Sequence, residues 1–409
     1  MQRELSKSVS SDNIQAAWCG LFFAMISYQL FILGSLLVFL GIVLKNLVDF
    51  PDLPAGLNDD ASAPMVSMLV PARNEELNIA GCVSSLLAQE YRNFEVIVID
   101  DQSTDGTMDA LRKLAAAPGG GRLRILEGTP LPDGWHGKAW ACQQLSERAS
   151  GDLLLFTDAD TRHRPDALRR AVEAIDRSGA DMLSLTPAQE IETFWEMLIV
   201  PLVYHILFSY LPIGMVWKSR SPAFCYAIGQ FILFRREAYG RIGGHLSVCS
   251  NLVEDVWLCK MVKRAGGKVA AFNGTDAVSC RMYRGFGEVW NGFSKNLFAG
   301  LGNNVWGLFA LMALVVLFYL APYGFLLTAM VQGDYSLAHF WLPAAQIAIA
   351  VCIRIIIAVK FRQPVWPGLL HAGSQVMLLL IAFNSFRLST FGRGPEWKGR
   401  SYRFKGDLH

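Results

Sequence analysis

The stretch FEVIVIDDQSTDG, residues 94–106, decides the fold. Its first part, Phe94–Ile99, is rich in β-branched side chains, which favour a buried strand. The strand closes on Asp100-Asp101, and the Ser, Thr, Asp and Gly that follow are turn residues with a helical pattern beyond them. A strand, a polar turn and a helix in this order form the repeating unit of a parallel α/β sheet.

The same unit recurs on either side of this stretch. Further strands are predicted at Met65–Val70, Arg122–Leu126 and Asp152–Thr157, and the last runs into Asp158-Ala159-Asp160. Ligands of open parallel sheets bind at the carboxyl ends of the strands, so the acidic residues after two of these strands are expected to face one crevice. The predicted fold class is α/β with a mostly parallel sheet.

Charge is scarce in this chain of 409 residues, of which 18% are charged and 52% apolar, with a mean hydropathy of +0.30. Soluble domains carry about 25% charged residues. Ala16–Leu44 contains no Asp, Glu, Lys or Arg and exceeds the roughly 20 residues that span a bilayer. Three more segments with few charges are Leu297–Gly333, Tyr335–Ile353 and Val365–Phe386. We therefore expect N-terminal and C-terminal transmembrane helices.

Two classes of protein are disfavoured by composition. The net charge of +2, with no clustered basic face, gives no reason to expect a nucleic-acid partner. The eight cysteines are scattered without a Cys-x-x-Cys pair or a neighbouring His at metal spacing, so neither a disulfide framework nor a zinc site is expected. A reducing, cytoplasmic setting fits them.

The expected organisation has six parts. They are an N-terminal tail (1–15), a transmembrane anchor (16–44), a linker (45–63), a large α/β domain (64–296), C-terminal membrane segments (297–386) and a basic tail (387–409). Val365–Phe386 is expected to insert only partly, because Gly373-Ser374-Gln375 interrupts its apolar run, and the tail would then stay cytoplasmic.

Three acidic clusters are candidates for chemistry. Asp158 and Asp160 can hold a hard divalent cation that also binds waters and substrate phosphates, or they can form a turn and helix cap. Asp100-Asp101 can accept hydrogen bonds from a nucleotide, or can be turn residues. Glu254-Asp255 opens a helical stretch, where one carboxylate can act as a general base or both can simply stabilise the first turn.

Phe194–Trp217 is an apolar segment inside the domain whose only charge is Glu196. A single membrane crossing here would put Asp160 and Asp255 on opposite faces of the membrane. The segment (194–217) is therefore expected to be an interfacial membrane helix beside the site, since its prolines and aromatic residues suit that position. An apolar core helix is the alternative.

Four motifs in this order resemble the signature of family 2 glycosyltransferases with the GT-A fold. They are VPARNEE at 70–76, IDDQSTDGT at 99–107, Asp158-Ala159-Asp160 and Glu254-Asp255. The resemblance implies a Rossmann-like GT-A domain on the cytoplasmic side, a nucleotide-sugar donor and a divalent Mg²⁺ or Mn²⁺. It also implies a single in-line displacement that inverts the anomeric carbon.

The resemblance assigns roles to the residues that match these motifs. The nucleotide-sugar positions are Pro71, Arg73, Glu75, Asp100, Asp101 and Asp158. Asp160, together with Asp158, matches the metal and diphosphate ligands. Asp255 matches the catalytic base, and Glu254 is the less favoured choice.

Two further segments narrow the resemblance to membrane glycosyltransferases of carotenoid and hopanoid pathways. LPDGWHGKAWAC at 131–142 contains Lys138, whose ammonium can contact the donor diphosphate or be a solvated loop charge. The second segment, residues 281–296, is most similar to the carotenoid type. Arg281, Trp290 and Lys295 within it are assigned to the acceptor or the diphosphate. The Gln-x-x-Arg-Trp motif of processive synthases is not matched, since the nearest string is RMYRG at 281–285.

These observations predict a multi-pass enzyme of the inner (plasma) membrane with its catalytic domain in the cytoplasm. The expected reaction is the metal-dependent, inverting transfer of one sugar, glucose from UDP-glucose, to a hydrophobic membrane lipid such as a carotenoid acid or another terpenoid. The first alternative is a polyprenyl-phosphate or ceramide-type sugar transferase. A processive polysaccharide synthase and a non-enzymatic membrane subunit are the others.

Overall fold

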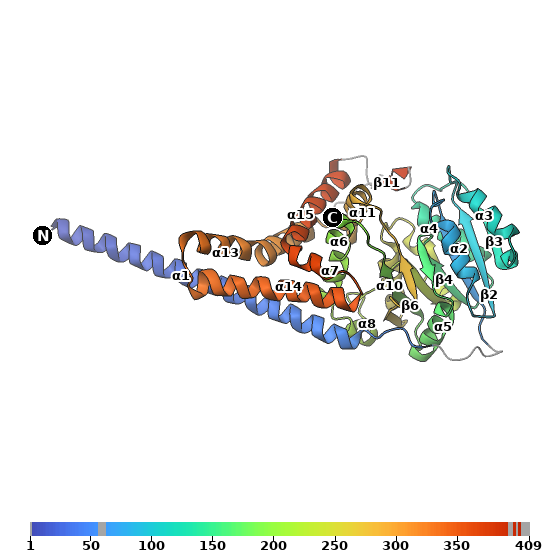
Figure 1. Ribbon diagram of the computed structural model, residues 1–409, viewed down its shortest axis with the longest axis horizontal. Coiled ribbons are helices and arrows are strands. Elements are labelled where there is room, and N and C mark those ends of the chain that lie inside the picture. Colours follow the sequence, from blue (N-terminus) through green and yellow to red (C-terminus); the bar gives the residue numbers. More distant parts are fainter. Residues whose placement is uncertain (1, 56–62, 392–395, 398–399, 402–409) are drawn as a thin grey trace.

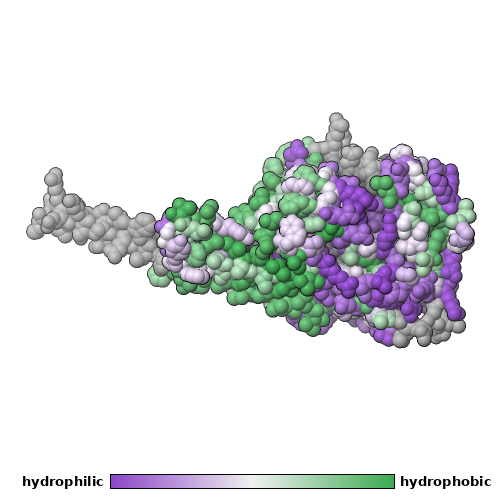
Figure 2. Space-filling model, viewed as in Figure 1, coloured by the Kyte–Doolittle hydropathy of each residue, from purple (hydrophilic) through white to green (hydrophobic). Residues whose placement is uncertain are grey.

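The computed structural model describes residues 2–55, 63–391, 396–397 and 400–401. An α/β domain lies at one end of an elongated molecule, and a bundle of long helices extends from it (Figure 1). The space-filling view shows apolar side chains over the bundle and polar side chains over much of the α/β domain (Figure 2).

The α/β domain contains a seven-stranded sheet with the order β3-β2-β1-β4-β8-β6-β9. Its strands are β1 (Val66–Ala72), β2 (Phe94–Asp100), β3 (Leu123–Glu127), β4 (Leu153–Thr157), β6 (Met182–Thr186), β8 (Phe231–Arg235) and β9 (Val269–Asn273). All neighbours are parallel except β8, which runs antiparallel between β4 and β6. The mostly parallel α/β sheet predicted from the sequence is confirmed, and β1 to β4 coincide with the four predicted strands.

Both faces of this sheet are covered. Helices on the two faces are α2 (Ile79–Leu87), α3 (Thr107–Ala116), α4 (Gly137–Arg148), α5 (Ala167–Ser178), α9 (Arg236–Arg241) and α10 (Glu254–Arg264). Along β1, Met68 and Val70 belong to one hydrophobic core and Leu69 to the other, as the two-residue period of a strand requires. Strands buried on both faces read as continuous apolar runs, which is why the sequence made them recognisable.

A small second sheet follows directly from the carboxyl edge of the large one. It consists of β5 (Thr161–His163), β10 (Val278–Cys280) and β7 (Ala188–Gln189), in the order β5-β10-β7. Cys280 pairs with Thr161 on one side and Gln189 on the other. This pairing fixes the chain immediately after Asp158 and Asp160.

Four helical stretches of the described chain are long and apolar enough to cross a membrane: Phe23–Asp49, Val305–Gln332, Leu337–Lys360 and Trp366–Phe391. They are built from α1 (Gln2–Asp49), α12 (Val305–Val315), η3 (Val316–Leu320), α13 (Ala321–Gln332), η4 (Leu337–Trp341), α14 (Leu342–Lys360), η5 (Trp366–Leu370) and α15 (His371–Phe391). α11 (Phe286–Gly300) joins them to the domain and packs against α15. The expected helices at both ends of the chain are confirmed by length and composition.

The last of these stretches, Trp366–Phe391, is broken at a different place from the one expected. Instead of an interruption at Gly373-Ser374-Gln375, the structure has the single turn η5 followed by one continuous helix, α15. Its partial insertion in the membrane stays a prediction. Most of the predicted basic tail (387–409) lies outside the described residues, which there comprise 387–391, 396–397 and 400–401.

The segment predicted as one interfacial helix is divided into α6 (Phe194–Ile199), α7 (Leu202–Tyr210) and α8 (Gly214–Lys218). Pro201 and Pro212 lie at the two breaks, because proline cannot donate the backbone hydrogen bond that would continue a helix. The Asn46 side-chain amide of α1 donates hydrogen bonds of 2.9 and 2.8 Å to the carbonyls of Phe208 and Leu211. The segment thus packs between the sheet and the apolar helices, and its contact with a bilayer surface stays a prediction.

Candidate active site

The acidic residues singled out in the sequence lie at the carboxyl edge of the large sheet. β2 ends at Asp100, and Asp158 and Asp160 follow the last residue of β4. Glu254 and Asp255 open α10, which comes from a distant part of the chain. A side chain from a third element, α4, connects the last two groups.

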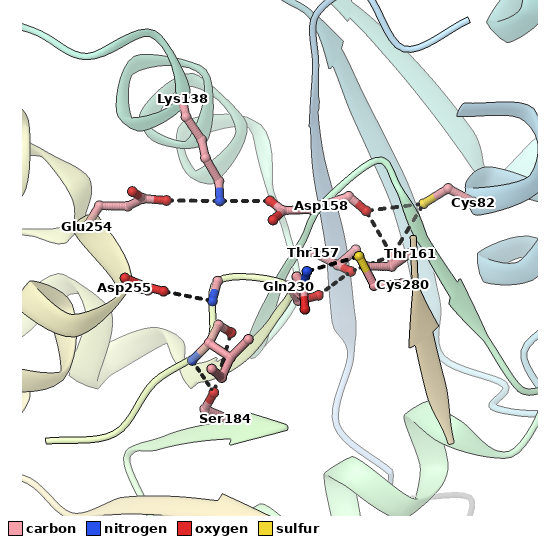
Figure 3. Close-up of polar contacts among 12 residues, drawn as sticks. Cys82, Lys138, Thr157, Asp158, Thr161, Ser184, Gln230, Glu254, Asp255 and Cys280 are labelled. Atoms are coloured by element: carbon pink, nitrogen blue, oxygen red, sulfur yellow. Dashed lines mark hydrogen bonds and ion pairs between the residues drawn. The ribbon is translucent and has the colours of Figure 1, made fainter. Parts of the chain in front are cut away.

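Lys138 forms this connection from the first turn of α4. Its Nζ lies 2.7 Å from Asp158 Oδ1 and 3.0 Å from Glu254 Oε1 (Figure 3). Burial by itself lowers the pKa of Lys138, but the two carboxylates outweigh it and raise that pKa well above the usual value. Lys138 is therefore a charged bridge inside the site rather than a solvated loop lysine.

The Lys138 bridge is one reason why the two members of the acidic pair, Glu254 and Asp255, have different pKa values. Burial raises the pKa of Asp255 to about 7, and the charge of Glu254 adds to this effect. Burial would also raise the pKa of Glu254, but its ion pair with Lys138 lowers that pKa overall. Two neighbouring acids with pKa values driven apart are characteristic of divided acid and base roles. Glu254 stays ionised, whereas Asp255 can exchange a proton near neutral pH.

Asp255 is also held in a defined orientation. Its Oδ2 accepts a hydrogen bond of 2.9 Å from the Gly229 N–H (Figure 3). Its Oδ1 accepts one of 2.8 Å from the Val256 N–H. A Cβ added at Gly229 would lie 3.1 Å from Lys138 Nζ and 3.5 Å from Asp255 Oδ2. Glycine is therefore the residue that lets the backbone approach both groups so closely.

Asp160 is under-satisfied in the protein alone. Burial, together with the charges of Asp158 and Glu75, raises its pKa to about 7. Its buried Oδ1 has no hydrogen-bond partner. A divalent cation would supply the missing positive charge, so Asp160 and Asp158 fit a metal site. In the described part of the chain no group of three or more His, Cys, Asp or Glu side chains could hold a metal ion, so further ligands would come from waters and a bound phosphate.

The loops after β1 and β2 lock onto each other where a nucleotide is expected. Arg73 Nη1 donates hydrogen bonds of 2.6 and 3.0 Å to the carbonyls of Asp101 and Gln102. Both loops contain a non-glycine residue in the left-handed region, Asn74 with φ 51° and Gln102 with φ 59°. Such conformations are uncommon and concentrate at functional sites. Arg73 thus positions the loop after β2 instead of pointing freely into the crevice.

Other predicted nucleotide residues share this corner. Pro71 lies in β1 and lines a small cavity together with Lys138 and Asp158. The Glu75 N–H donates a 2.8 Å hydrogen bond to Thr107 Oγ1, which joins the two loops. Asp100 is buried and its Oδ1 has no hydrogen-bond partner, so an acceptor remains available at the end of β2.

The three residues predicted to contact the acceptor or the diphosphate lie in different surroundings. The Arg281 N–H donates a 3.4 Å hydrogen bond to the Asp160 carbonyl, and Nη2 pairs with Glu192 at 2.6 Å. Trp290 packs instead on Phe286, with 5.8 Å between ring centroids. Lys295 lies toward α4, where its charge adds to burial in lowering the pKa of His136. The structure thus brings the Arg281 backbone beside Asp160, directs its guanidinium to Glu192, and leaves Trp290 in an aromatic cluster.

Two residues near the site were not found from the sequence. Gln230 Nε2 donates a 2.9 Å hydrogen bond to Cys280 Sγ, and its backbone carbonyl accepts one of 2.8 Å from Thr157 Oγ1 (Figure 3). The His136 ring lies 2.9 Å from the Ser250 carbonyl and ties α4 to the loop before α10. His136 lies inside the quoted motif at 131–142, which was its signal, whereas Gln230 belongs to no motif.

The order of the large sheet agrees with the GT-A fold that the sequence predicts. Residues 67–243 match the family model described as glycosyl transferase family 2. The matched region includes β1 to β4 and the Asp158–Asp160 motif. Glu254 and Asp255 follow the matched region.

The similar proteins agree with this assignment. The chain is 29% identical over 243 residues to the 4,4'-diaponeurosporenoate glycosyltransferase of Staphylococcus haemolyticus (strain JCSC1435), which covers 58% of this chain and 61% of that protein. It is 29% identical over 246 residues to the protein of that name in Staphylococcus aureus (strain USA300), with 58% and 62% covered. The match thus spans about three-fifths of the length of these relatives.

One solved structure confirms the fold. The mannosyltransferase PcManGT from Pyrobaculum calidifontis, in complex with GDP-Man and Mn²⁺, aligns with a TM-score of 0.52 at 19% sequence identity. The alignment covers 88% of this chain and 99% of that one. At this identity the likeness concerns the arrangement of the chain alone.

Proposed function

We propose that this protein is an inverting, metal-dependent glycosyltransferase that moves one sugar from a nucleotide donor to a hydrophobic lipid in the membrane. The donor in this proposal is UDP-glucose, and the acceptor is a carotenoid acid or another terpenoid. The observation that carries the proposal is the Lys138 bridge, which joins the Asp158–Asp160 motif to Glu254 and Asp255. In this proposal the donor site and the base lie together at the carboxyl edge of the large sheet.

The donor half of the site would use the loops after β1, β2 and β4. Asp100, at the end of β2, offers an unpartnered carboxylate oxygen for a nucleotide hydroxyl or base. Asp160 and Asp158 would hold Mg²⁺ or Mn²⁺, which when bound neutralises charge on the departing diphosphate. Arg281, whose backbone N–H is bonded to the Asp160 carbonyl, would exchange its ion pair with Glu192 for one with the same phosphates.

Asp255 is the general base in this proposal. It would remove the proton from an acceptor hydroxyl, or from the un-ionised carboxyl of a carotenoid acid, as that oxygen attacks the anomeric carbon on the face opposite the diphosphate and the C–O bond to the diphosphate breaks. A base works best when its pKa lies near the working pH, and the pKa of Asp255 is raised to about 7. Glu254, paired with Lys138, would keep its charge and hold the pair in place.

The lipid acceptor is supported by two independent features. The relatives are named for a carotenoid acid, 4,4'-diaponeurosporenoate. This chain also has four apolar helices beside its α/β domain, so a membrane lipid is within reach. Lys45 and Lys360 lie at the ends of α1 and α14 that adjoin the domain, and the positive-inside rule then favours a cytoplasmic domain in the plasma membrane.

A product assay tests this proposal. Membranes containing the protein are incubated with a panel of labelled nucleotide sugars, and the extracted lipids are identified by mass spectrometry. The expected product is one lipid carrying a single hexose, formed from UDP-glucose only when Mg²⁺ or Mn²⁺ is present. Asp109→Asn on the exposed face of α3 is the matched control and should act as wild type. A polymeric product, a sugar phosphate ester, or no product with any donor would contradict the proposal.

A further inference from the structure

A cluster of buried polar side chains lies among the apolar helices, apart from the carboxylates of the active site. It consists of His205 on α7, Tyr319 in η3, Arg354 on α14 and His371 at the start of α15. None of the four is more than 2% exposed. The His205 and His371 ring centroids are 4.9 Å apart, and each lies 5.1 to 5.5 Å from that of Tyr319.

Most donors of this cluster have no partner. Arg354 Nη2 donates one long hydrogen bond of 3.4 Å to the Leu198 carbonyl, and its buried Nη1 has none. Both ring nitrogens of His205 and Nδ1 of His371 are likewise without a hydrogen bond. The guanidinium interacts electrostatically with both imidazoles, which offer it no negative charge.

An unpaired arginine in this position is unfavourable in the protein alone. No ion pair among the described residues includes Arg354, although it is 2% exposed and lies in a membrane-length helix. Burying a charge without a counter-charge is costly, and ionisable residues inside membrane segments characteristically serve binding or transport. Water would satisfy the free N–H groups but would not compensate the charge.

The cluster lies at a depth where lipid head groups can reach it. Arg354 is six residues before Lys360, the domain-proximal end of α14, which corresponds to about 9 Å along a helix. The single turn η5 packs directly against Arg354, since a Cβ added at Gly368 would lie 3.5 Å from Arg354 Cγ. The outer side of η5 exposes Trp366, Leu369 and Leu370, an apolar surface suited to lipid chains.

We propose that this cluster binds the anionic group of a membrane lipid, either a carboxylate or a phosphate. The Arg354 guanidinium would pair with two of its oxygens, as its planar fork favours, and the His205 and His371 N–H groups would donate to the same group. η5 is the turn that must move to admit it. The adjacent π-helical turn η3, which holds Tyr319, belongs to a class of irregularity frequent at binding sites. This inference does not depend on sugar transfer.

A thermal unfolding titration of the full chain in detergent tests the site. The probes are oleic acid for the carboxylate, phosphatidic acid for the phosphate and diacylglycerol as the neutral control. The Tm of the wild type should rise to a plateau with at least one anionic lipid and should not rise with diacylglycerol. Whichever lipid raises the Tm identifies the bound group as a carboxylate or a phosphate. Arg354→Met should unfold at the wild-type temperature or above, since an unpaired buried charge is removed, and should lose at least tenfold in lipid affinity.

Arg362→Met, which removes an exposed arginine just beyond the same helix, is the matched control and should keep the lipid response. The proposal is overturned if wild type responds equally to diacylglycerol, or if Arg354→Met responds as wild type does. Native mass spectrometry of the wild type tests the same site without depending on whether a variant folds. One anionic lipid retained per chain supports the site, and retention of none overturns it.

Discussion

The two edges of the large sheet treat buried carboxylates in opposite ways. At the amino edge, Glu95 of β2 accepts hydrogen bonds of 2.6 Å from Ser67 Oγ, 2.8 and 2.6 Å from the N–H and Oγ of Ser150, and 2.9 Å from Arg124 Nη1. Burial alone would raise the pKa of Glu95, but these bonds outweigh it and lower the pKa to about 2. This carboxylate is fully satisfied by the protein.

At the carboxyl edge two carboxylates, Asp100 and Asp160, lack a full set of partners. Asp100 and Asp160 each keep a buried oxygen without a hydrogen bond, and the pKa values of Asp160 and Asp255 are raised to about 7. The difference teaches that burial by itself does not identify a functional acid. Glu95 stabilises the fold, whereas under the proposed function the carboxyl-edge acids bind a cation or take a proton from the acceptor.

Asp160→Ala should give the largest effect and separate the two edges most clearly. Under the proposed function it removes a metal and diphosphate ligand, so transfer should fall by about 1000-fold or more. Thermal stability should not fall, because the buried Oδ1 of Asp160 has no partner and the neighbouring charges of Asp158 and Glu75 disfavour its ionised form. Transfer rate and Tm are measured on the same preparation. Near-normal turnover would remove Asp160 from the site.

Lys138→Met should reduce the transfer rate less than Asp160→Ala and should also change its pH dependence. Lys138 both holds Asp158 and Glu254 in position and supplies a positive charge near Asp255. Loss of the bridge should reduce transfer by about 10- to 100-fold, as for residues that orient a metal site. Lys138 lowers the pKa of Asp255, so its removal should raise that pKa and move the acidic limb of the pH–rate profile to higher pH. Lys138→Arg should restore part of the rate. An unshifted profile would show that Lys138 does not act on Asp255.

Glu95→Gln should have the smallest effect on transfer and act on stability alone. The lost charge-assisted bonds should cost about 1–3 kcal/mol, measured as a lower Tm with kcat unchanged. The folded-state pKa is depressed, so in wild type this contribution is complete above the unfolded value of about 4.3 and is lost as pH falls toward 2. The Tm difference between wild type and variant should therefore shrink below about pH 4. A reduced kcat at normal stability would contradict the claim that Glu95, at the amino edge of the sheet, serves stability alone.

The sequence was sufficient for the parts of the fold that are local. β1 to β4 were predictable because each is a short apolar run ended by polar residues, and the strand-end position of Asp158 and Asp160 located the site. The antiparallel insertion of β8 between β4 and β6 was not predictable, because its apolar sequence fits either direction.

The contacts that define the site depend on distant segments. Lys138, Asp158 and Glu254 come from three elements far apart along the chain, and no spacing rule indicates that one ammonium bridges both acids. The same holds for Arg354, whose lack of a partner is visible only once the helices are packed. Pro201 and Pro212, in contrast, were visible signals for the three short helices that replaced the single expected one.

Asp255→Asn tests the central claim most directly, because it keeps the size of the side chain and removes only its ability to take a proton. Lipid glycosylation and metal-dependent binding of labelled UDP-glucose are measured on the same purified variant. We predict that transfer falls by about 100- to 10,000-fold, the usual contribution of a general base, while donor binding stays at the wild-type level. Transfer at the wild-type rate would contradict the assignment of Asp255 as the base and with it the division of roles between Asp255 and Glu254.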